Sequence, residues 1–256
     1  MTLDPSNQDQ SGSTDAYFAV AQNVYPSARR LRWALQLLFK GVPLSGRSVL
    51  DVGGGSGAIS FYAAAKGASR VLCLEPSAAG SNPSMDEAFQ RFERGLDDPT
   101  AVELERKTFQ EFAPEGQQFD VIVINAAINH LDEEACARLP HDPIARASYL
   151  ELFRKLYKLM VPGGQMVLAD AAQRNLWGAV GMRSPFAPTI DWRIHAQPRV
   201  WAELAQQAGF VDSKIQWQTT HRLGPLGHRL LGNAFGSWLT NSHFVVSTRR
   251  ASSAGA

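Results

Sequence analysis

Short apolar runs alternate with longer amphipathic stretches along most of the chain. The runs at 48–52, 70–74 and 119–124 are rich in Val, Leu and Ile, which is typical of parallel strands buried on both faces. Stretches such as 149–160 place apolar residues on one side of a helix and lysines on the other. This alternation predicts an α/β fold built on a mostly parallel sheet. The predicted strands are 48–52, 70–74, 102–106, 119–124, 165–169, 213–219 and 242–248.

The N-terminus and two internal segments depart from this alternation. Residues 1–14 are mostly polar, and their Ser, Asn, Gln and Asp content predicts a disordered tail. Helical spacing begins at Asp15, so residues 15–41 predict N-terminal helices. The segments 171–198 and 221–241 interrupt the repeat with Pro or Gly and with aromatic residues. The pattern therefore predicts one main domain with two inserts, after the fifth and sixth strands.

Two connections within that domain have an unusual composition. Residues 132–146 contain two prolines and are predicted to form a long surface loop. Residues 161–164, Val-Pro-Gly-Gly, are predicted to form a tight turn that leads into the fifth strand.

A glycine-rich turn follows the first predicted strand. Gly53, Gly54, Gly55 and Gly57 stand between this strand and a predicted helix, where a bound nucleotide could approach the bare backbone. A turn without a ligand is the alternative. The spacing also fits the loose fingerprint of dinucleotide-binding folds, but Asp51 would repel a pyrophosphate and suits an ammonium group instead.

Four segments together resemble the motifs of class I S-adenosylmethionine-dependent methyltransferases. The first is 49–57, Val-Leu-Asp-Val-Gly-Gly-Gly-Ser-Gly, and the others follow in the family's order at 71–76, 119–124 and 159–168. The resemblance covers residues 45–250 and weakens after 170. It implies a seven-stranded, mostly parallel, doubly wound sheet with an antiparallel last strand. It also implies that the N-terminal helices form a lid over the cofactor, although packing on the outside of the sheet is an equal alternative.

The resemblance assigns the cofactor S-adenosylmethionine to particular residues. Asp51 holds its amino-acid part, the glycines of the turn lie against it, and Glu75 binds the ribose diol. Aromatic rings with hydroxyl groups from the N-terminal helices are expected to contact it as well. For Phe109 the alternative to a cofactor contact is packing in the core. The predicted cofactor-binding residues are Tyr17, Tyr25, Asp51, Gly53, Gly54, Gly55, Gly57, Glu75, Pro76, Thr108, Phe109 and Asn125.

The same resemblance places the methyl-transfer site after the fourth and fifth strands. Asn125 and Asn129 are expected to hold a substrate by hydrogen bonds, and Asp170 to line the site. His130 is the candidate general base, since the ordinary pKa of histidine suits proton transfer near neutral pH. Capping of a turn or helix is the alternative role of Asn125 and His130.

The first insert, 171–198, mixes aromatic residues with arginines. Such a loop suits a substrate pocket, in which arginines bind a carboxylate or phosphate through paired hydrogen bonds. A flap whose aromatic residues fill its own small core is the alternative. The second insert, 221–241, is expected to complete the pocket. The predicted substrate residues are Arg174, Trp177, Arg183, Trp192 and His195.

Composition narrows the classes of partner. The 256 residues carry a net charge of +1, which gives no reason to expect nucleic acid. The chain lacks an apolar stretch of membrane-spanning length and an N-terminal signal pattern, so a cytoplasmic protein without a membrane partner is expected. Cys73 and Cys136 are expected to be unpaired thiols, and no metal site is expected because no ligand spacing is recognisable. A homodimer is left open.

The leading hypothesis is transfer of a methyl group from S-adenosylmethionine to a small molecule through an oxygen or nitrogen nucleophile, with secondary metabolites among the candidate acceptors. An NAD(P)-dependent oxidoreductase is the first alternative. The Tyr-x-x-x-Lys pair of short-chain dehydrogenases is missing, since Tyr149 is followed four positions on by Phe153 and Tyr157 by Val161. A methyltransferase-like subunit that binds a partner without catalysis is the second alternative.

Overall fold

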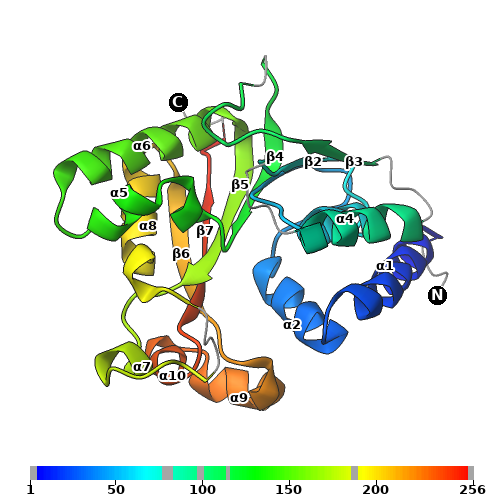
Figure 1. Cartoon of the computed structure of the whole chain (residues 1–256). Coiled ribbons are helices and arrows are strands. Elements are labelled where there is room, and N and C mark those ends of the chain that lie inside the picture. Colours follow the sequence, from blue (N-terminus) through cyan, green and yellow to red (C-terminus); the bar gives the residue numbers. More distant parts are fainter. Residues whose placement is uncertain (1–4, 77–82, 97–100, 114–115, 186–189, 253–256) are drawn as a thin grey trace. The chain divides into compact units, whose positions relative to one another are not determined.

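The computed structural model describes residues 5–76, 83–96, 101–113, 116–185 and 190–252 (Figure 1). The strands are β1 (Ser48–Val52), β2 (Arg70–Leu74), β3 (Val102–Glu105), β4 (Phe119–Asn125), β5 (Met160–Ala171), β6 (Val211–Trp217) and β7 (His243–Arg249). They form one sheet in the order β3-β2-β1-β4-β5-β7-β6, in which β7 is antiparallel to both neighbours. The predicted α/β fold class, with seven strands and an antiparallel last strand, is confirmed. By its contacts the chain divides into two compact units, Met1–Val123 and Ile124–Ala256.

The first unit contains the parallel strands β1, β2 and β3 with four helices. Val49 and Leu50 of β1 are fully buried, as the apolar runs predicted for a central parallel strand. Asp120 accepts hydrogen bonds from the backbone N–H and hydroxyl of Ser48, which ties the start of β4 to the start of β1. The helices are α1 (Pro5–Val24), α2 (Ala28–Leu38), α3 (Ala58–Ala65) and α4 (Pro83–Gly95).

Helix α1 differs from its prediction. It begins at Pro5 and not at Asp15, so the predicted disordered segment 1–14 is wrong from Pro5 onward. Extending an existing helix is far easier than nucleating one, so polar residues can continue a helix that is packed further along. The apolar part of α1 contacts α3 and α4.

In the second unit, strand β7 lies between β5 and β6. The helices α5 (Glu133–Arg138), α6 (Pro143–Lys158) and α8 (Pro198–Gln207) lie together beside these strands in Figure 1, and α6 contacts both others. Phe153 of α6 stacks on Trp201 of α8, and both side chains are fully buried. This aromatic pair therefore belongs to the core of the second unit.

Four segments predicted to be irregular contain regular elements in the structure. The predicted loop 132–146 contains α5 and the start of α6, because Asp132 and Asp142 cap the two helices through their carboxylates. The predicted turn 161–164 belongs to β5, where Gly163 N–H donates to the carbonyl of Arg250 over 3.0 Å. Both inserts contain short helices, which are α7 (Leu176–Ala179), η3 (Trp192–Ile194), η4 (His221–Leu223), α9 (Gly224–Leu231) and α10 (Ala234–Leu239). All of these except α9 begin at a residue whose side chain caps the helix.

Candidate functional site

The glycine-rich turn of the first unit is held against the end of strand β2. The N–H groups of Gly53 and Gly54 both donate to the carbonyl of Leu74, over 2.8 and 3.3 Å. Gly53, Gly55 and Gly57 have φ angles of 70°, 53° and 76°, in the left-handed region that side chains strongly disfavour. The turn therefore needs glycine for its backbone path, as well as for access to a ligand.

Gly57 has a second constraint, which is the space beside it. A Cβ atom added there would lie 2.6 Å from Cδ2 of Phe89, so the helix α3 can start at this point only without a side chain. Gly41 offers a matched comparison, because it has the same φ of 76° and no atom within 4 Å of an added Cβ.

We expect Gly57→Ala to lower the free energy of unfolding by about 1–3 kcal/mol more than Gly41→Ala does. Both variants suffer the same left-handed strain, on the order of 1–2 kcal/mol, and only Gly57→Ala adds the clash with the Phe89 ring. Urea unfolding of the two variants and the parent measures the difference. Equal losses in the two variants would mean that the ring moves aside freely.

Asp51 is a buried carboxylate that lies at the end of strand β1. It is 1% exposed, and its Oδ2 accepts a hydrogen bond of 2.7 Å from the hydroxyl of Ser60. Its other oxygen, Oδ1, is buried and has no hydrogen-bond partner among the described residues. Burial raises the pKa of Asp51 to about 7, opposed by the Ser60 hydrogen bond and reinforced by the charge of Glu75. A cation placed beside Oδ1 would offset this desolvation.

Glu75 follows strand β2, as predicted, and one of its oxygens already contacts the turn. Its Oε2 accepts a hydrogen bond of 2.9 Å from the N–H of Gly55. Pro76, the next predicted residue, is half-buried. Thr108 donates its hydroxyl to Glu111 over 2.8 Å, whereas Phe109 is 2% exposed and takes the alternative role of a core residue.

The two tyrosines predicted to contact the cofactor have different surroundings. Tyr17 is fully buried, stacks on Phe92 and donates its hydroxyl to the carbonyl of Ala58 over 2.8 Å. In this arrangement Tyr17 contributes to the core, and its predicted contact with the cofactor stays a prediction. Tyr25 instead shares a hydrogen bond with the hydroxyl of Ser56 inside the glycine turn. Of the two tyrosines, Tyr25 is the one that contacts this turn directly.

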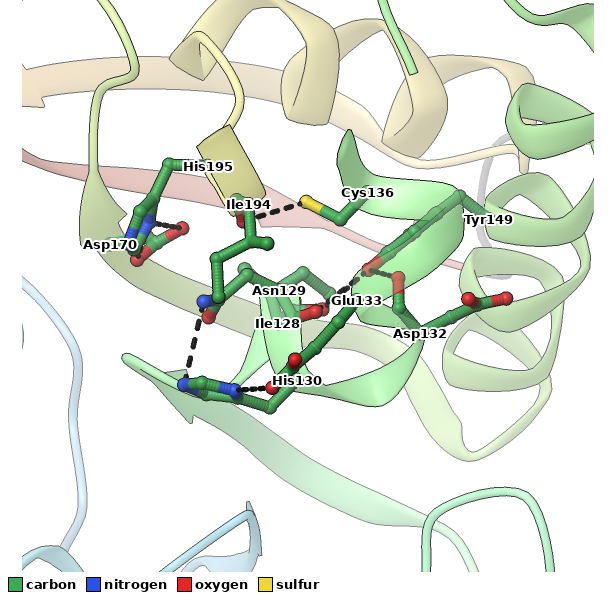
Figure 2. Close-up of polar contacts among 10 residues, drawn as sticks. All are labelled: Ile128, Asn129, His130, Asp132, Glu133, Cys136, Tyr149, Asp170, Ile194 and His195. Atoms are coloured by element: carbon green, nitrogen blue, oxygen red, sulfur yellow. Dashed lines mark hydrogen bonds and ion pairs between the residues drawn. The ribbon is translucent and has the colours of Figure 1, made fainter. Parts of the chain in front are cut away.

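In the second unit, the structure pairs two residues that the sequence had assigned separate roles. Asp170, near the end of β5, faces His195, and Figure 2 shows both carboxylate oxygens directed at the imidazole. Nδ1 of His195 lies 3.1 and 3.2 Å from the two oxygens, and both residues are buried. The carboxylate therefore orients the ring and favours a proton on Nδ1, which leaves Nε2 as the proton-accepting atom.

The residues predicted at the end of strand β4 and just after it have contacts different from those of the Asp170–His195 pair. Asn125 is exposed, and Asn129 is buried, with an Oδ1 atom that has no partner in the described part of the chain. His130 is exposed, and its Nδ1 lies 2.6 Å from a carboxylate oxygen of Glu133 one helical turn further on (Figure 2). The hydroxyl of Tyr149 donates to the carbonyl of Ile128 and fixes the backbone of this segment.

A pocket of about 460 Å³ lies within the second unit. Of the predicted substrate residues only Arg174 lines it. Trp177 donates to the carbonyl of Thr240, Arg183 is exposed, and the ring of Trp192 lies 6.2 Å from that of His195. The sequence analysis did not name the other lining side chains, although the segment 221–241, expected to complete a pocket, contains three of them. The polar and aromatic lining residues are Arg174, Gln197, Arg199, Trp217, Phe235 and Trp238.

Comparison with known proteins identifies the class. The profile of the family described as Methyltransferase domain matches residues 24–214, so the chain belongs to this family. Its resemblance to class I S-adenosylmethionine-dependent methyltransferases, and the assignment of that cofactor to the family, are thereby confirmed. No protein with a curated function matches the chain.

Solved structures with the same fold have low sequence identity. An S-adenosylmethionine-dependent methyltransferase from Mesorhizobium loti has a TM-score of 0.56 and 18% identity, with 85% of this chain and 96% of that chain covered. A possible histamine N-methyltransferase from Thermotoga maritima has a TM-score of 0.53 and 13% identity, with coverages of 84% and 87%. Phospholethanolamine N-methyltransferase 2 from Haemonchus contortus, bound to phosphomonomethylethanolamine and S-adenosylhomocysteine, has a TM-score of 0.55 and 16% identity, with coverages of 86% and 52%. These similarities show the fold alone.

The described residues also bear on membrane spans and metal sites. Among the helices described, none has the length and apolar character needed to cross a membrane. Within the same residues, no group of three or more His, Cys, Asp and Glu side chains is placed to hold a metal ion.

Proposed function

We propose that this protein transfers a methyl group from S-adenosylmethionine to an oxygen or nitrogen nucleophile of a small molecule. The observation that carries the cofactor assignment is the lone buried Oδ1 of Asp51 beside a turn of left-handed glycines. A buried carboxylate of this kind is stabilised by a cationic partner, and the α-ammonium group of the cofactor is one.

The residues of the first unit fit the cofactor in chemistry as well as in position along the chain. Asp51 would hold the ammonium group, and the bare backbone of Gly53 and Gly55 would lie against the ligand. Glu75 would bind the ribose diol, since only one of its oxygens is engaged by Gly55. When bound, S-adenosylmethionine supplies a methyl group that is electrophilic because it is attached to a positively charged sulfonium.

For the acceptor side we propose the Asp170–His195 pair. Nε2 of His195 takes the proton of the acceptor hydroxyl or ammonium group, and Asp170 holds the imidazole and stabilises its cationic form. His130 remains the competing candidate for this role. Its imidazole is exposed and pairs with the equally exposed Glu133, so the surrounding protein positions it less firmly. Asn125 and Asn129 stay proposed contacts of the acceptor.

Direct binding distinguishes the proposal from its first alternative. We expect calorimetric titration of the purified chain to show saturable binding of S-adenosylmethionine and S-adenosylhomocysteine, and at least about tenfold weaker binding of NADH, whose pyrophosphate meets the Asp51 carboxylate. Glu75→Gln should weaken S-adenosylmethionine binding, while Glu103→Gln, in an exposed ion pair with Arg70, should not. Tight binding of NADH with none of S-adenosylmethionine would reverse the assignment.

A second experiment separates an enzyme from a binding subunit. The protein is incubated with S-adenosylmethionine carrying a labelled methyl group and with fractionated cell extract. We expect label to enter a small molecule that mass spectrometry can identify. A different outcome would favour the non-catalytic alternative. In that outcome the cofactor binds and a partner protein co-purifies, but no fraction of the extract accepts label.

A further inference from the structure

The pocket of the second unit has a chemical character of its own. Its volume of about 460 Å³ is within the range of roughly 300–1,000 Å³ typical of small-molecule sites. Its charged lining residues are Arg174 and Arg199, and no Asp or Glu is among the described residues that line it. Both guanidinium groups are exposed enough to meet a ligand. The pocket therefore favours an anion.

Three of the other lining side chains are flat aromatic rings, those of Trp217, Phe235 and Trp238. Phe235 and Trp238 stack on each other, with ring centroids 6.1 Å apart and planes inclined by 24°. Phe235 keeps 64% of its surface exposed, so its ring is open to a ligand. Trp217 closes another side of the pocket and is held edge-on by the buried Phe244. Two aromatic walls of this kind suit a planar conjugated ring.

The pocket also contains an unused hydrogen-bond donor. Nε2 of Gln197 is buried and has no hydrogen-bond partner among the described residues, although the residue lines the pocket. A buried amide N–H group left without a partner is unfavourable by about 1–3 kcal/mol, and a ligand oxygen would remove that penalty. The ligand should therefore carry, besides its anionic group, an oxygen that accepts a hydrogen bond from this amide.

The pocket is built from the segments that carry the proposed proton acceptor. Arg174 follows strand β5 shortly after Asp170, and Gln197 follows His195 at the start of helix α8. Trp217 is the last residue of β6, so two carboxyl strand ends supply the lining. In α/β folds this edge of the sheet is where ligands bind. A shift in either segment would move the pocket and the Asp170–His195 pair together.

We infer that this pocket binds a planar aromatic molecule carrying a carboxylate or phosphate group, and that this molecule is the methyl acceptor. The arginines bind the anionic group, Trp217, Phe235 and Trp238 enclose the ring, and the amide of Gln197 donates to a ring oxygen. Only the role of this molecule as methyl acceptor rests on the proposed function. Its binding to the pocket can be measured without cofactor.

The test is calorimetric titration of the whole chain, without cofactor, with four probes: 4-hydroxybenzoate, 4-hydroxyphenyl phosphate, 4-hydroxybenzamide and 4-hydroxycyclohexanecarboxylate. We expect at least one of the two aromatic anions to bind about tenfold or more tightly than both the neutral amide and the non-aromatic acid. The relative affinities of the first two probes decide between carboxylate and phosphate. Comparable affinity for 4-hydroxybenzamide and both anions would overturn the inference.

Variants locate the binding site. Arg174→Gln and Arg199→Gln should each weaken binding of the preferred anion about tenfold, and Phe235→Ala several-fold. Arg229→Gln, an exposed arginine of helix α9 outside the pocket, is the matched control and should leave the affinity unchanged. Equal effects of Arg174→Gln and Arg229→Gln would overturn the site.

The same preparation separates this inference from the proposed function. S-adenosylmethionine is titrated in parallel, and its binding depends on residues of the first unit. If S-adenosylmethionine binds and neither aromatic anion does, the pocket inference is wrong and the proposed function stands. If the preferred anion binds and the parent methylates its ring hydroxyl, Arg174→Gln should raise KM with little change in kcat. Methylation with an unchanged KM in that variant would show that the acceptor lies elsewhere.

Discussion

Asp51→Asn protein is expected to bind S-adenosylmethionine about 100-fold more weakly than the parent at a pH near 8. Removing one partner of a buried, hydrogen-bonded charge pair typically weakens binding by about 2–5 kcal/mol, and 2.7 kcal/mol corresponds to this factor. The asparagine keeps the size of the side chain and its contact with Ser60, but it lacks the charge that attracts the ammonium group. Titration calorimetry of the two proteins measures the difference.

The pH dependence of binding gives the more specific result. In the cofactor-free protein, burial raises the pKa of Asp51 from its ordinary value of 3.8 to about 7. An ammonium ligand stabilises the ionised carboxylate and lowers that pKa again, so binding below pH 7 must release a proton. We therefore expect the parent's affinity to rise with pH up to about 7 and then level. The Asn variant should lose that rise, and heats measured in two buffers should detect the released proton.

The free energy of unfolding of the cofactor-free protein should fall as pH rises, opposite to the trend in cofactor affinity. A folded-state pKa above the unfolded one means that the folded chain binds more protons between about pH 4 and pH 7. The contribution of Asp51 to stability is thus present at low pH and is lost as pH rises through 7. Asp51→Asn should remove this loss, whereas Asp120→Asn, which breaks bonds to Ser48 and Arg47, serves as the carboxylate control that leaves cofactor affinity intact. A pH-independent affinity in the parent would contradict the ammonium assignment.

His195→Gln is expected to lower the rate of methyl transfer about 100- to 10,000-fold while the affinity for S-adenosylmethionine stays the same. Glutamine keeps a polar side chain near Asp170 but cannot accept the acceptor's proton at Nε2. Asp170→Asn should have a smaller effect, since the carboxylate orients the imidazole through Nδ1 and does not touch the acceptor. Single-turnover rates with the acceptor identified from extract measure the chemical step directly.

Two controls make this prediction specific. His130→Gln changes the other candidate histidine, which is exposed and paired with Glu133, and should leave the rate within about threefold of the parent. The second control is the affinity for S-adenosylmethionine, which should be the same in His195→Gln as in the parent. A large loss in His130→Gln with none in His195→Gln would return the role of base to His130.

Much of the fold was predictable because its signals are local. The apolar runs of β1, β2 and β4 and the turn after β1 depend on neighbours within a few residues, so the sequence pattern predicted their type and nearly their bounds. The predictions of secondary structure were wrong where a capping side chain, and not a periodic apolar pattern, starts a helix. Asp132 and Asp142 start two helices in a stretch that composition alone marks as a loop.

The candidate site also contains residues that the sequence pattern predicted and residues that it missed. Asp51 and Glu75 were predictable because a charged residue directly after an apolar strand has few structural reasons to be there. The cofactor contact of Tyr17 stays a prediction, because a buried aromatic residue and a ligand-facing one have the same sequence signature. Trp217 and Phe235 were missed for the same reason, since only burial and exposure distinguish a pocket wall from a core.

By itself, the sequence determined the fold class, the family and the residues expected to bind the cofactor, because strand ends and glycine turns are encoded by adjacent residues. Only the tertiary structure decided that Asp170 holds His195 and that arginines and aromatic rings from separate segments share one pocket. Such pairings join residues far apart in the chain, and their geometry depends on how helices and strands pack, which no local pattern of residues records.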